Sequence, residues 1–140
     1  MKLNICYDDK GHIANYTNIN ISDDGLNINH VVNNSCEEII VSDTLDYIPY
    51  ENINKTLFDI IQKIRLNGKL IIVGTDVRCV CRLTATDAIS IEQFCSLIRG
   101  VQSMNTEFNI KHLLASAGLK VESSLINHHK YEIIAVRKEA

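Results

Sequence analysis

The sequence of 140 residues contains no tryptophan, a single proline and only six glycines. Basic residues are not in excess either, because 14 lysines and arginines face 17 aspartates and glutamates, which gives a net charge of −3. Binding to nucleic acid or to an anionic membrane through charge requires a basic surface. The charge balance therefore predicts that neither is a partner of this protein.

Long apolar runs are also missing. No apolar stretch reaches the ~20 residues that a membrane-spanning helix needs, and the first residues show no apolar region of a signal peptide. The abundant residues are isoleucine, with 21, and asparagine, with 14, a bias typical of AT-rich bacterial and phage genomes. We therefore expect a cytoplasmic protein, located in the host cytoplasm or the virion if a phage encodes it.

The cysteines fit neither a disulfide framework nor a metal site. Their number is odd, which argues against closed pairing. Cys79 and Cys81 form a C-x-C pair, but no second pair stands at the spacing of a zinc site, which needs about four ligands. His128 and His129 are adjacent, so their side chains would diverge on a strand. We predict no metal site and expect the cysteines to fill the core. They are Cys6, Cys36, Cys79, Cys81 and Cys95.

The length fits one domain over residues 1–140, and its amino-terminal part favours strands. Leu3–Tyr7 is a short apolar segment, and Tyr16–Ile21 alternates polar and apolar residues before a Ser-Asp-Asp-Gly turn. Asn27–Val32 predicts a third, weaker strand. Glu38–Ser42 is a continuous run rich in β-branched residues, which is typical of a buried central strand.

The hydrophobic period changes after Pro49. Ile53, Leu57, Ile60, Ile61 and Ile64 fall on one face of a helix predicted over residues 52–64. We expect Gly68 to end this helix as a left-handed residue, with a buried strand over Lys69–Gly74. Strand, helix and strand form a right-handed βαβ unit, so the strands over 38–42 and 69–74 should be adjacent and parallel.

The carboxyl-terminal part predicts two helices and a closing pair of strands. Ser90 is an N-cap residue with Gln93 at the capping-box position, and Gly118 ends the second helix. A polar stretch of five residues then joins the two strands, as in an antiparallel hairpin. The predicted elements are helices at Ile91–Arg99 and Asn109–Ala117 and strands at Val121–Leu125 and Tyr131–Val136.

Several stretches follow the motif order of a known family. They read LNICYD, NYTNIN, EEIIVSDTLDYIP, IRLNGKLII and TD at residues 3–8, 15–20, 37–49, 64–72 and 75–76. In this order and spacing the chain resembles small class I S-adenosylmethionine (SAM)-dependent methyltransferases. The resemblance implies a Rossmann-like α/β fold with a mainly parallel sheet and an antiparallel carboxyl-terminal edge pair, with a reduced amino-terminal half.

The resemblance also implies a cofactor site. Cys6, Tyr7 and Asp8 stand where the family has a Gly-rich turn, and Asn20 stands where an acidic residue accepts hydrogen bonds from the ribose of SAM. At the end of the strand over 38–42, residues Ser42 and Asp43 follow at the edge where such sheets bind ligands. We take these residues as the cofactor-binding set.

Two departures from the family pattern bear on function. The turn Cys6-Tyr7-Asp8 has no glycine, so the backbone loses the close approach that glycine permits. Asn20 lacks the charge of the family's acid, and a charge-assisted hydrogen bond is roughly twice as strong as a neutral one. We therefore expect SAM to bind weakly or not at all, and the domain to be catalytically inactive, serving as a binding or structural module. An active enzyme on a small molecule or sugar, and a regulatory partner of an active paralogue, remain as alternatives.

Other polar residues are candidates for acid–base or binding roles. Asp43 and Asp46 flank the end of the strand over 38–42 and as paired carboxylates suit acid–base chemistry. We favour instead that Asp43 caps the next turn and that Asp46 is solvated. The remaining candidates, for which we favour packing or solvation over a ligand role, are His12, His30, Tyr47, Tyr50, Arg78, Arg82 and Arg99.

The first two connections between strands are short for helix-containing crossovers. A sheet face built from Ile5, Ile19 and Ile21 would then be poorly covered, and apolar surface left in water favours association. We expect a homo-oligomer or a larger assembly, with residues from about Met1 to Val32 at the contact. In two alternatives, the amino-terminal loops fold back over the sheet or the carboxyl-terminal helices reach it.

Overall fold

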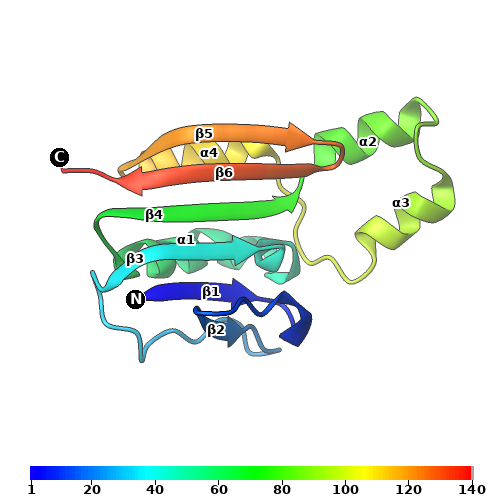
Figure 1. The fold of residues 1–140 in the computed structure, drawn as a ribbon. Coiled ribbons are helices and arrows are strands. Elements are labelled where there is room, and N and C mark those ends of the chain that lie inside the picture. Colours follow the sequence, from blue (N-terminus) through cyan, green and yellow to red (C-terminus); the bar gives the residue numbers. More distant parts are fainter. Residues whose placement is uncertain (140) are drawn as a thin grey trace.

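The structure, a computed structural model, describes residues 1–139. Within them the chain forms one six-stranded sheet in the order β2-β1-β3-β4-β6-β5 (Figure 1). The strands β2, β1, β3 and β4 are parallel, and β6 is antiparallel to both β4 and β5. This confirms the predicted fold class. The elements are β1 (Lys2–Cys6), β2 (Thr17–Asn20), β3 (Cys36–Ser42), α1 (Ile53–Lys63), β4 (Ile64–Thr75), α2 (Val77–Ala85), α3 (Ile91–Ile98), α4 (Glu107–Ser116), β5 (Leu119–Asn127) and β6 (Lys130–Arg137).

The predicted βαβ unit is present as β3, α1 and β4. The two strands are adjacent and parallel, with Val41 opposite Ile72. The helix α1 buries the apolar stripe that its sequence period predicts, including Ile53, Leu57 and Ile60. This unit forms the centre of the sheet and confirms the prediction from the isoleucine pattern.

The predicted role of Gly68 is wrong. The helix α1 ends at Lys63 and β4 begins at once with Ile64, so Gly68 lies inside the strand instead of ending the helix. Ile64 is fully buried and pairs with Cys36 of β3. Because of this pairing, β4 begins before Lys69, where its apolar run predicts it to start. A side chain at Gly68 would place Cβ 2.8 Å from the carbonyl oxygen of Arg65. The close approach explains why glycine is suited to this position.

The carboxyl-terminal elements agree with the sequence, with two differences. The helix α3 begins at a capping box in which Ser90 and Gln93 bond reciprocally to each other's backbone, as predicted. The hairpin between β5 and β6 turns through two residues instead of five, because His128 adopts a left-handed conformation with φ of 58°. The helix α2 was not predicted, and Asp76 caps its start by accepting from the Cys79 amide.

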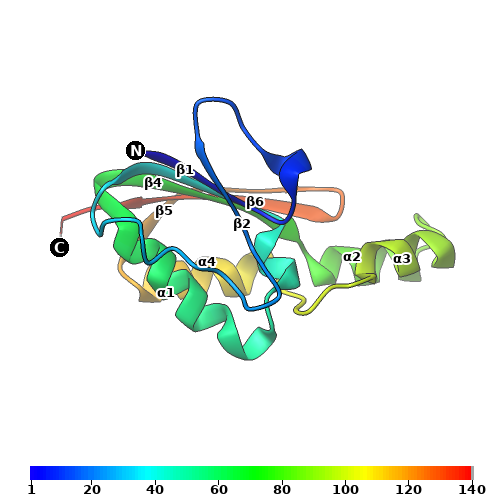
Figure 2. The same ribbon diagram turned by 90° about the horizontal axis from the view of Figure 1, so that it is seen from below.

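The two helices α1 and α4 lie on the same face of the sheet (Figure 2). The core forms between this face and the two helices, with Leu3, Ile39, Leu70 and Ile133 fully buried. The helices α2 and α3 instead project beyond the end of the sheet (Figure 1). Among the helices of residues 1–139, none is long and apolar enough to cross a membrane.

The amino-terminal half differs from the sequence-based expectation. Residues 27–32 form no strand, because Ile28 and Val31 are spaced three residues apart and both insert into the core as anchors of an irregular segment. Ile5 is fully buried, and Ile19 and Ile21 pack against the same core. The predicted uncovered face is thus wrong, since the connection from β2 to β3 folds back over it. The oligomeric state itself stays a prediction.

Candidate functional site

The carboxyl ends of β1, β2 and β3 meet at one edge of the sheet. The chain leaves β1 toward β2 on one side, while β3 lies on the other side of β1. Ligands of open α/β sheets bind in the crevice at such a switch point. The six residues predicted to bind the cofactor all lie at or just beyond these strand ends: Cys6, Tyr7, Asp8, Asn20, Ser42 and Asp43. Their role in binding stays a prediction.

A cavity of about 720 Å³ opens at this edge. Tyr7 and Asp8 belong to its lining, whereas the other four predicted residues do not. Tyr47, a candidate for which packing is favoured above, lines it as well. The remaining walls come from residues that the sequence does not assign to the site, namely 21–25, 48, 49, 52, 100 and 102. The volume lies in the range of ~300–1,000 Å³ typical of small-molecule pockets. The position of the Ser-Asp-Asp-Gly turn directly after β2 is the signal that could have placed residues 22–25 here.

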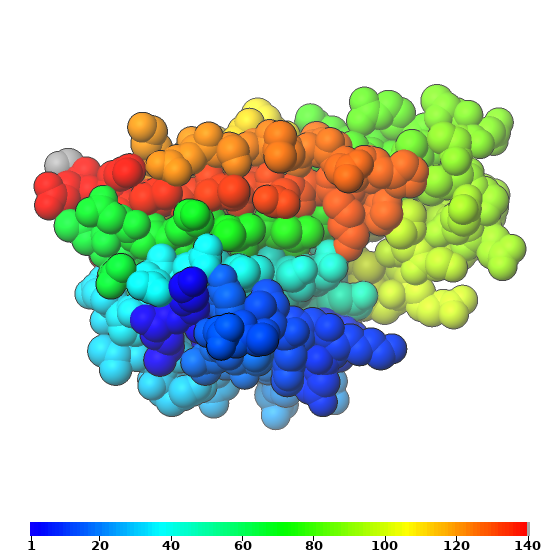
Figure 3. All heavy atoms as spheres, in the orientation of Figure 1, coloured from blue at the N-terminus to red at the C-terminus, as the bar shows by residue number. Residues whose placement is uncertain are grey.

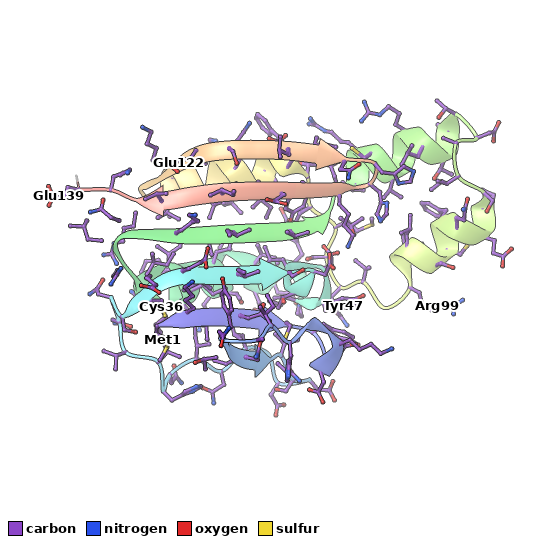
Figure 4. The ribbon with its side chains drawn as sticks, viewed as in Figure 1. Met1, Cys36, Tyr47, Arg99, Glu122 and Glu139 are labelled. Carbon is purple, nitrogen blue, oxygen red and sulfur yellow. The ribbon has the colours of Figure 1, made fainter. Side chains whose placement is uncertain are left out.

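Two tyrosine rings span the switch point. Tyr7 follows β1, and Tyr47 ends the short 3-10 turn Thr44–Tyr47 that follows β3. Their ring centroids are 4.0 Å apart with an angle of 22° between the planes, which is a stacked arrangement. Figure 4 shows Tyr47 beside the carboxyl end of β3. The crevice between β1 and β3 is therefore bridged by aromatic side chains of this chain.

The exposed Asn20 side chain makes contacts with three residues of its own chain. Its Nδ2 donates to Asp9 Oδ1 at 2.6 Å, and its Oδ1 lies 2.9 Å from His12 Nε2 and 3.1 Å from Cys6 Sγ. His12 is exposed, as favoured above, but its ring is oriented by Asn20. Burial raises the pKa of the Cys6 thiol, and the nearby Asp8 and Asp9 raise it further.

The turn after β1 folds onto the strand. The backbone carbonyl of Gly11 accepts from Asn4 Nδ2 at 2.7 Å. A side chain at Gly11 would bring Cβ within 2.9 Å of Cys6 Cβ, so only glycine permits this close packing. Chain atoms thus pack against Cys6, in the turn where the family pattern places glycines for close approach to the cofactor.

Asp43 and Asp46 differ from the favoured expectations. The Asp43 side chain does not cap the following turn and instead pairs with Lys130. Asp46 is only 4% exposed and accepts weakly from the Thr75 amide, with N–O distances of 3.3 and 3.4 Å. Burial raises the pKa of Asp46 to about 6. Its burial follows from the inward turn of Thr44–Tyr47, whose Asp46 carbonyl accepts from the amides of residues 102 and 103.

The walls of the cavity are acidic. Asp8, Asp23 and Asp24 contribute carboxylates, and no lysine or arginine is among the lining residues that the structure describes. Phosphate groups are usually held by basic side chains or by glycine-rich backbone at a helix start. The cavity therefore disfavours phosphorylated ligands such as dinucleotides and suits a neutral or cationic molecule.

The arginine and histidine candidates do not converge on this cavity. Arg78 and Arg82 line a separate pocket of about 400 Å³, where Arg78 lies over the Phe108 ring at 5.8 Å. Arg99 is exposed at the end of α3, so the three arginines form no clamp. His30 is exposed in the connection between β2 and β3.

Metal-binding geometry is absent from residues 1–139, in which no three His, Cys, Asp or Glu side chains cluster suitably. Cys79 is buried while Cys81 is exposed, so the C-x-C pair diverges on α2. His128 and His129 occupy the hairpin turn with their Nδ1 atoms 2.8 Å apart. They therefore face each other, contrary to the prediction that they diverge on a strand.

The comparison with known proteins rests on structure. No profile of a known protein family matches the chain, and no curated protein matches it. An O-methyltransferase family protein from Burkholderia thailandensis has a TM-score of 0.62 at 13% identity, covering 89% of this chain and 36% of that one. A SAM-dependent methyltransferase from Aquifex aeolicus gives 0.56 at 12%, covering 89% of this chain and 56% of that one.

Magnesium protoporphyrin IX methyltransferase from Synechocystis, solved with bound SAH, gives a TM-score of 0.56 at 14% identity. The match covers 76% of this chain and 47% of that enzyme. These similarities establish the fold, which is that of the class I SAM-dependent methyltransferases. The chain spans between 36% and 56% of the length of the three structures named here.

Proposed function

We propose that this chain is a methyltransferase-fold domain that has lost SAM-dependent catalysis and serves as a binding or assembly module. The observation that carries the proposal is the Asn20 side chain, which occupies the expected ribose position and already bonds to Asp9 and approaches His12 and Cys6. A ribose hydroxyl that donates to Asn20 Oδ1 would compete with His12 and Cys6, which already approach that oxygen. It would gain in exchange only neutral hydrogen bonds, which are roughly half as strong as those to a carboxylate.

The switch point supports the same conclusion. The stacked rings of Tyr7 and Tyr47 lie across the crevice in which a cofactor of this fold would be held. Opening the stack would forfeit an aromatic contact of about 0.5–1.5 kcal/mol. Binding of SAM in the manner of the family is thus opposed at the ribose position and at the switch point.

Calorimetric titration of SAM into the purified protein tests the proposal. We expect a dissociation constant weaker than about 1 mM, equivalent to less than about 4 kcal/mol of binding free energy. Micromolar binding by the unchanged protein would contradict the proposal. A combined variant, Cys6→Gly with Asp8→Gly and Asn20→Asp, restores a glycine-containing turn and a charged ribose acceptor, and we expect it to bind at least about tenfold more tightly. The control is Asn29→Asp, which adds the same charge on an exposed loop.

An active methyltransferase is the second candidate, and the acidic cavity favours it. SAM carries a positively charged sulfonium, which carboxylates from Asp8, Asp23 and Asp24 would attract. Incubation with methyl-labelled SAM and a panel of sugars and hydroxylated small molecules distinguishes the two candidates. We expect no transfer of label above the level of a boiled control, and sustained transfer to any acceptor would favour the enzyme.

A further inference from the structure

The helix α3 stands apart from the rest of the domain. Together with α2 it forms a helical arm that projects beyond the end of the sheet (Figures 1 and 3). Five of the eight residues of α3 are apolar, yet none of the eight is buried by the chain that the structure describes. Most of the stability of helices in proteins comes from packing of an apolar face. This helix therefore presents an apolar face that the described chain covers only in part.

The exposed apolar residues form a stripe along α3. Ile91, Phe94, Cys95 and Ile98 are spaced at i, i+3, i+4 and i+7, which places them on one face of the helix. Ile91 is 68% exposed, and Cys95 is exposed as well. Phe94 and Ile98 are half-buried, as is Leu97 beside them. The centre of the stripe lies between Phe94 and Cys95.

Two opposite charges flank this stripe. Glu92 and Arg99 are seven residues apart, so they lie within about 20° of each other around the helix axis. Both are exposed, and neither forms an ion pair among the described residues. Figure 4 shows Arg99 pointing away from the domain at the end of α3. The helix thus carries a negative charge at one end and a positive charge at the other, on the same flank.

We propose that α3 is the contact of a homodimer, in which it packs antiparallel against α3 of a second copy. A two-fold axis near Phe94 and Cys95 joins the two apolar stripes and makes the contact self-complementary. The same axis brings Glu92 beside Arg99 of the partner subunit, twice per dimer. In a parallel arrangement the same flank of the two helices lies on opposite sides of the contact, so neither of these charge pairs would form. The charge pattern therefore selects a second copy in one orientation.

The size of the stripe sets the expected strength. A standard interface buries about 800 Å² on each partner, and a single eight-residue helix offers less. We therefore expect a dimer that forms and dissociates with concentration. The dimer contact rests on the proposed function, because it is the surface through which an assembly module would associate. Its tests do not involve SAM, so either proposal can fail while the other holds.

Light scattering after gel filtration, over a range of protein concentrations, is the first test. We expect Ile91→Glu to shift the protein to the monomer, while circular dichroism shows unchanged folding because Ile91 is largely exposed. Val32→Glu is the matched control, since Val32 is 71% exposed but lies at the end of the amino-terminal region, far along the chain from α3. A protein that is monomeric at all concentrations, or a dimer lost in Val32→Glu and kept in Ile91→Glu, would overturn the proposal.

Charge reversal tests the orientation. Glu92→Arg and Arg99→Glu should each weaken the dimer by roughly fivefold, because each creates like-charge pairs at both ends of the contact. The double variant, Glu92→Arg with Arg99→Glu, restores opposite charges and should recover the original dissociation constant. If the losses of dimer affinity in the two single variants instead add up in the double variant, the antiparallel arrangement is excluded.

Oxidative cross-linking tests the position of the axis. With copper phenanthroline and air as the oxidant, two Cys95 thiols near the axis should join as a disulfide-linked dimer. The variant Cys95→Ser should lose the cross-link. Cys81→Ser is the control, because Cys81 is the other exposed cysteine of the arm and lies on α2. Cross-linking that depends on Cys81 instead, or recruitment of α3 to lipid vesicles without a dimer, would refute the contact.

Discussion

We expect the Asp46→Asn substitution to affect stability differently at different pH. Relative to the unchanged protein, the free energy of unfolding of the variant should be higher near neutral pH than in acid. Asp46 is almost fully buried, and its carboxyl group accepts only long hydrogen bonds from the Thr75 amide. Lys130, a positive charge that lowers the pKa of Asp46, is already paired with Asp43. An asparagine keeps one oxygen to accept from Thr75 and removes the buried charge.

The size of the effect follows from the pKa of Asp46. Burial raises it from 3.8 to about 6, which at 1.36 kcal/mol for each tenfold change in proton affinity corresponds to about 3 kcal/mol. Because the pKa is higher in the folded state than in the unfolded state, the folded protein retains the proton longer. In the unchanged protein, the stability that protonated Asp46 provides relative to its charged form is complete below about pH 3.8. It is lost as the pH rises through about 6.

Urea unfolding of both proteins from pH 3.5 to 7.5 measures this difference. We expect the free energy of unfolding of Asp46→Asn, relative to the unchanged protein, to rise by about 3 kcal/mol across that range. The change with pH is the informative quantity, because any fixed effect of the amide cancels. Asp24→Asn, on an exposed loop, removes the same charge without removing a buried group. Parallel profiles of Asp46→Asn and the unchanged protein would refute the reasoning.

Three further variants test the packing around the site, each by urea unfolding. Tyr131→Phe removes a buried hydroxyl that has no hydrogen-bond partner among the described residues, and should stabilise by about 1 kcal/mol; destabilisation would contradict this. Gly74→Ala places Cβ 2.5 Å from the Tyr131 hydroxyl oxygen and 2.7 Å from its ring carbon. It should destabilise by about 3 kcal/mol, and adding Tyr131→Phe should not rescue it. Thr44→Val removes the hydrogen bond from the buried Thr44 hydroxyl to the Ile5 carbonyl at 2.9 Å, and should destabilise by about 1–2 kcal/mol; no loss would show that the bond contributes little.

The elements that could be predicted are those fixed by local chemistry. The isoleucine stripe of α1 and the capping box at Ser90 depend only on neighbours within the same helix, and both are present. The prediction for Gly68 is wrong because the local rule that glycine ends a helix is overridden by strand pairing between distant residues. The pairing of Ile64 with Cys36 extends β4 back to the end of the helix, and no local pattern encodes that pairing.

The site was less predictable because its walls come from distant parts of the chain. Asp46 is buried because its turn is held by backbone amides of residues 102 and 103, more than fifty residues later. Its sequence neighbours give no sign of this burial and favour a solvated carboxylate. The spacing of the apolar residues over 27–32 argues against the strand predicted there. Ile28 and Val31 are three apart, whereas a strand with one buried face requires a period of two.

The contacts around Asn20 and the absence of an α-helix between β1 and β2 have a common geometric cause. Ten residues, 7–16, separate β1 from β2, and they must return from the carboxyl edge of the sheet to its amino edge. A crossover of this length has no room for a helix of several turns, and here it forms only the 3-10 turn Asp9–Gly11. Gly11 of this segment packs on Cys6 and accepts from Asn4, while most of residues 7–16 stay exposed. The same path sets His12 beside Asn20. The short connection therefore leaves no room for a helix, and it brings Asp9 and His12 against Asn20, the residue that the resemblance places at the ribose of SAM.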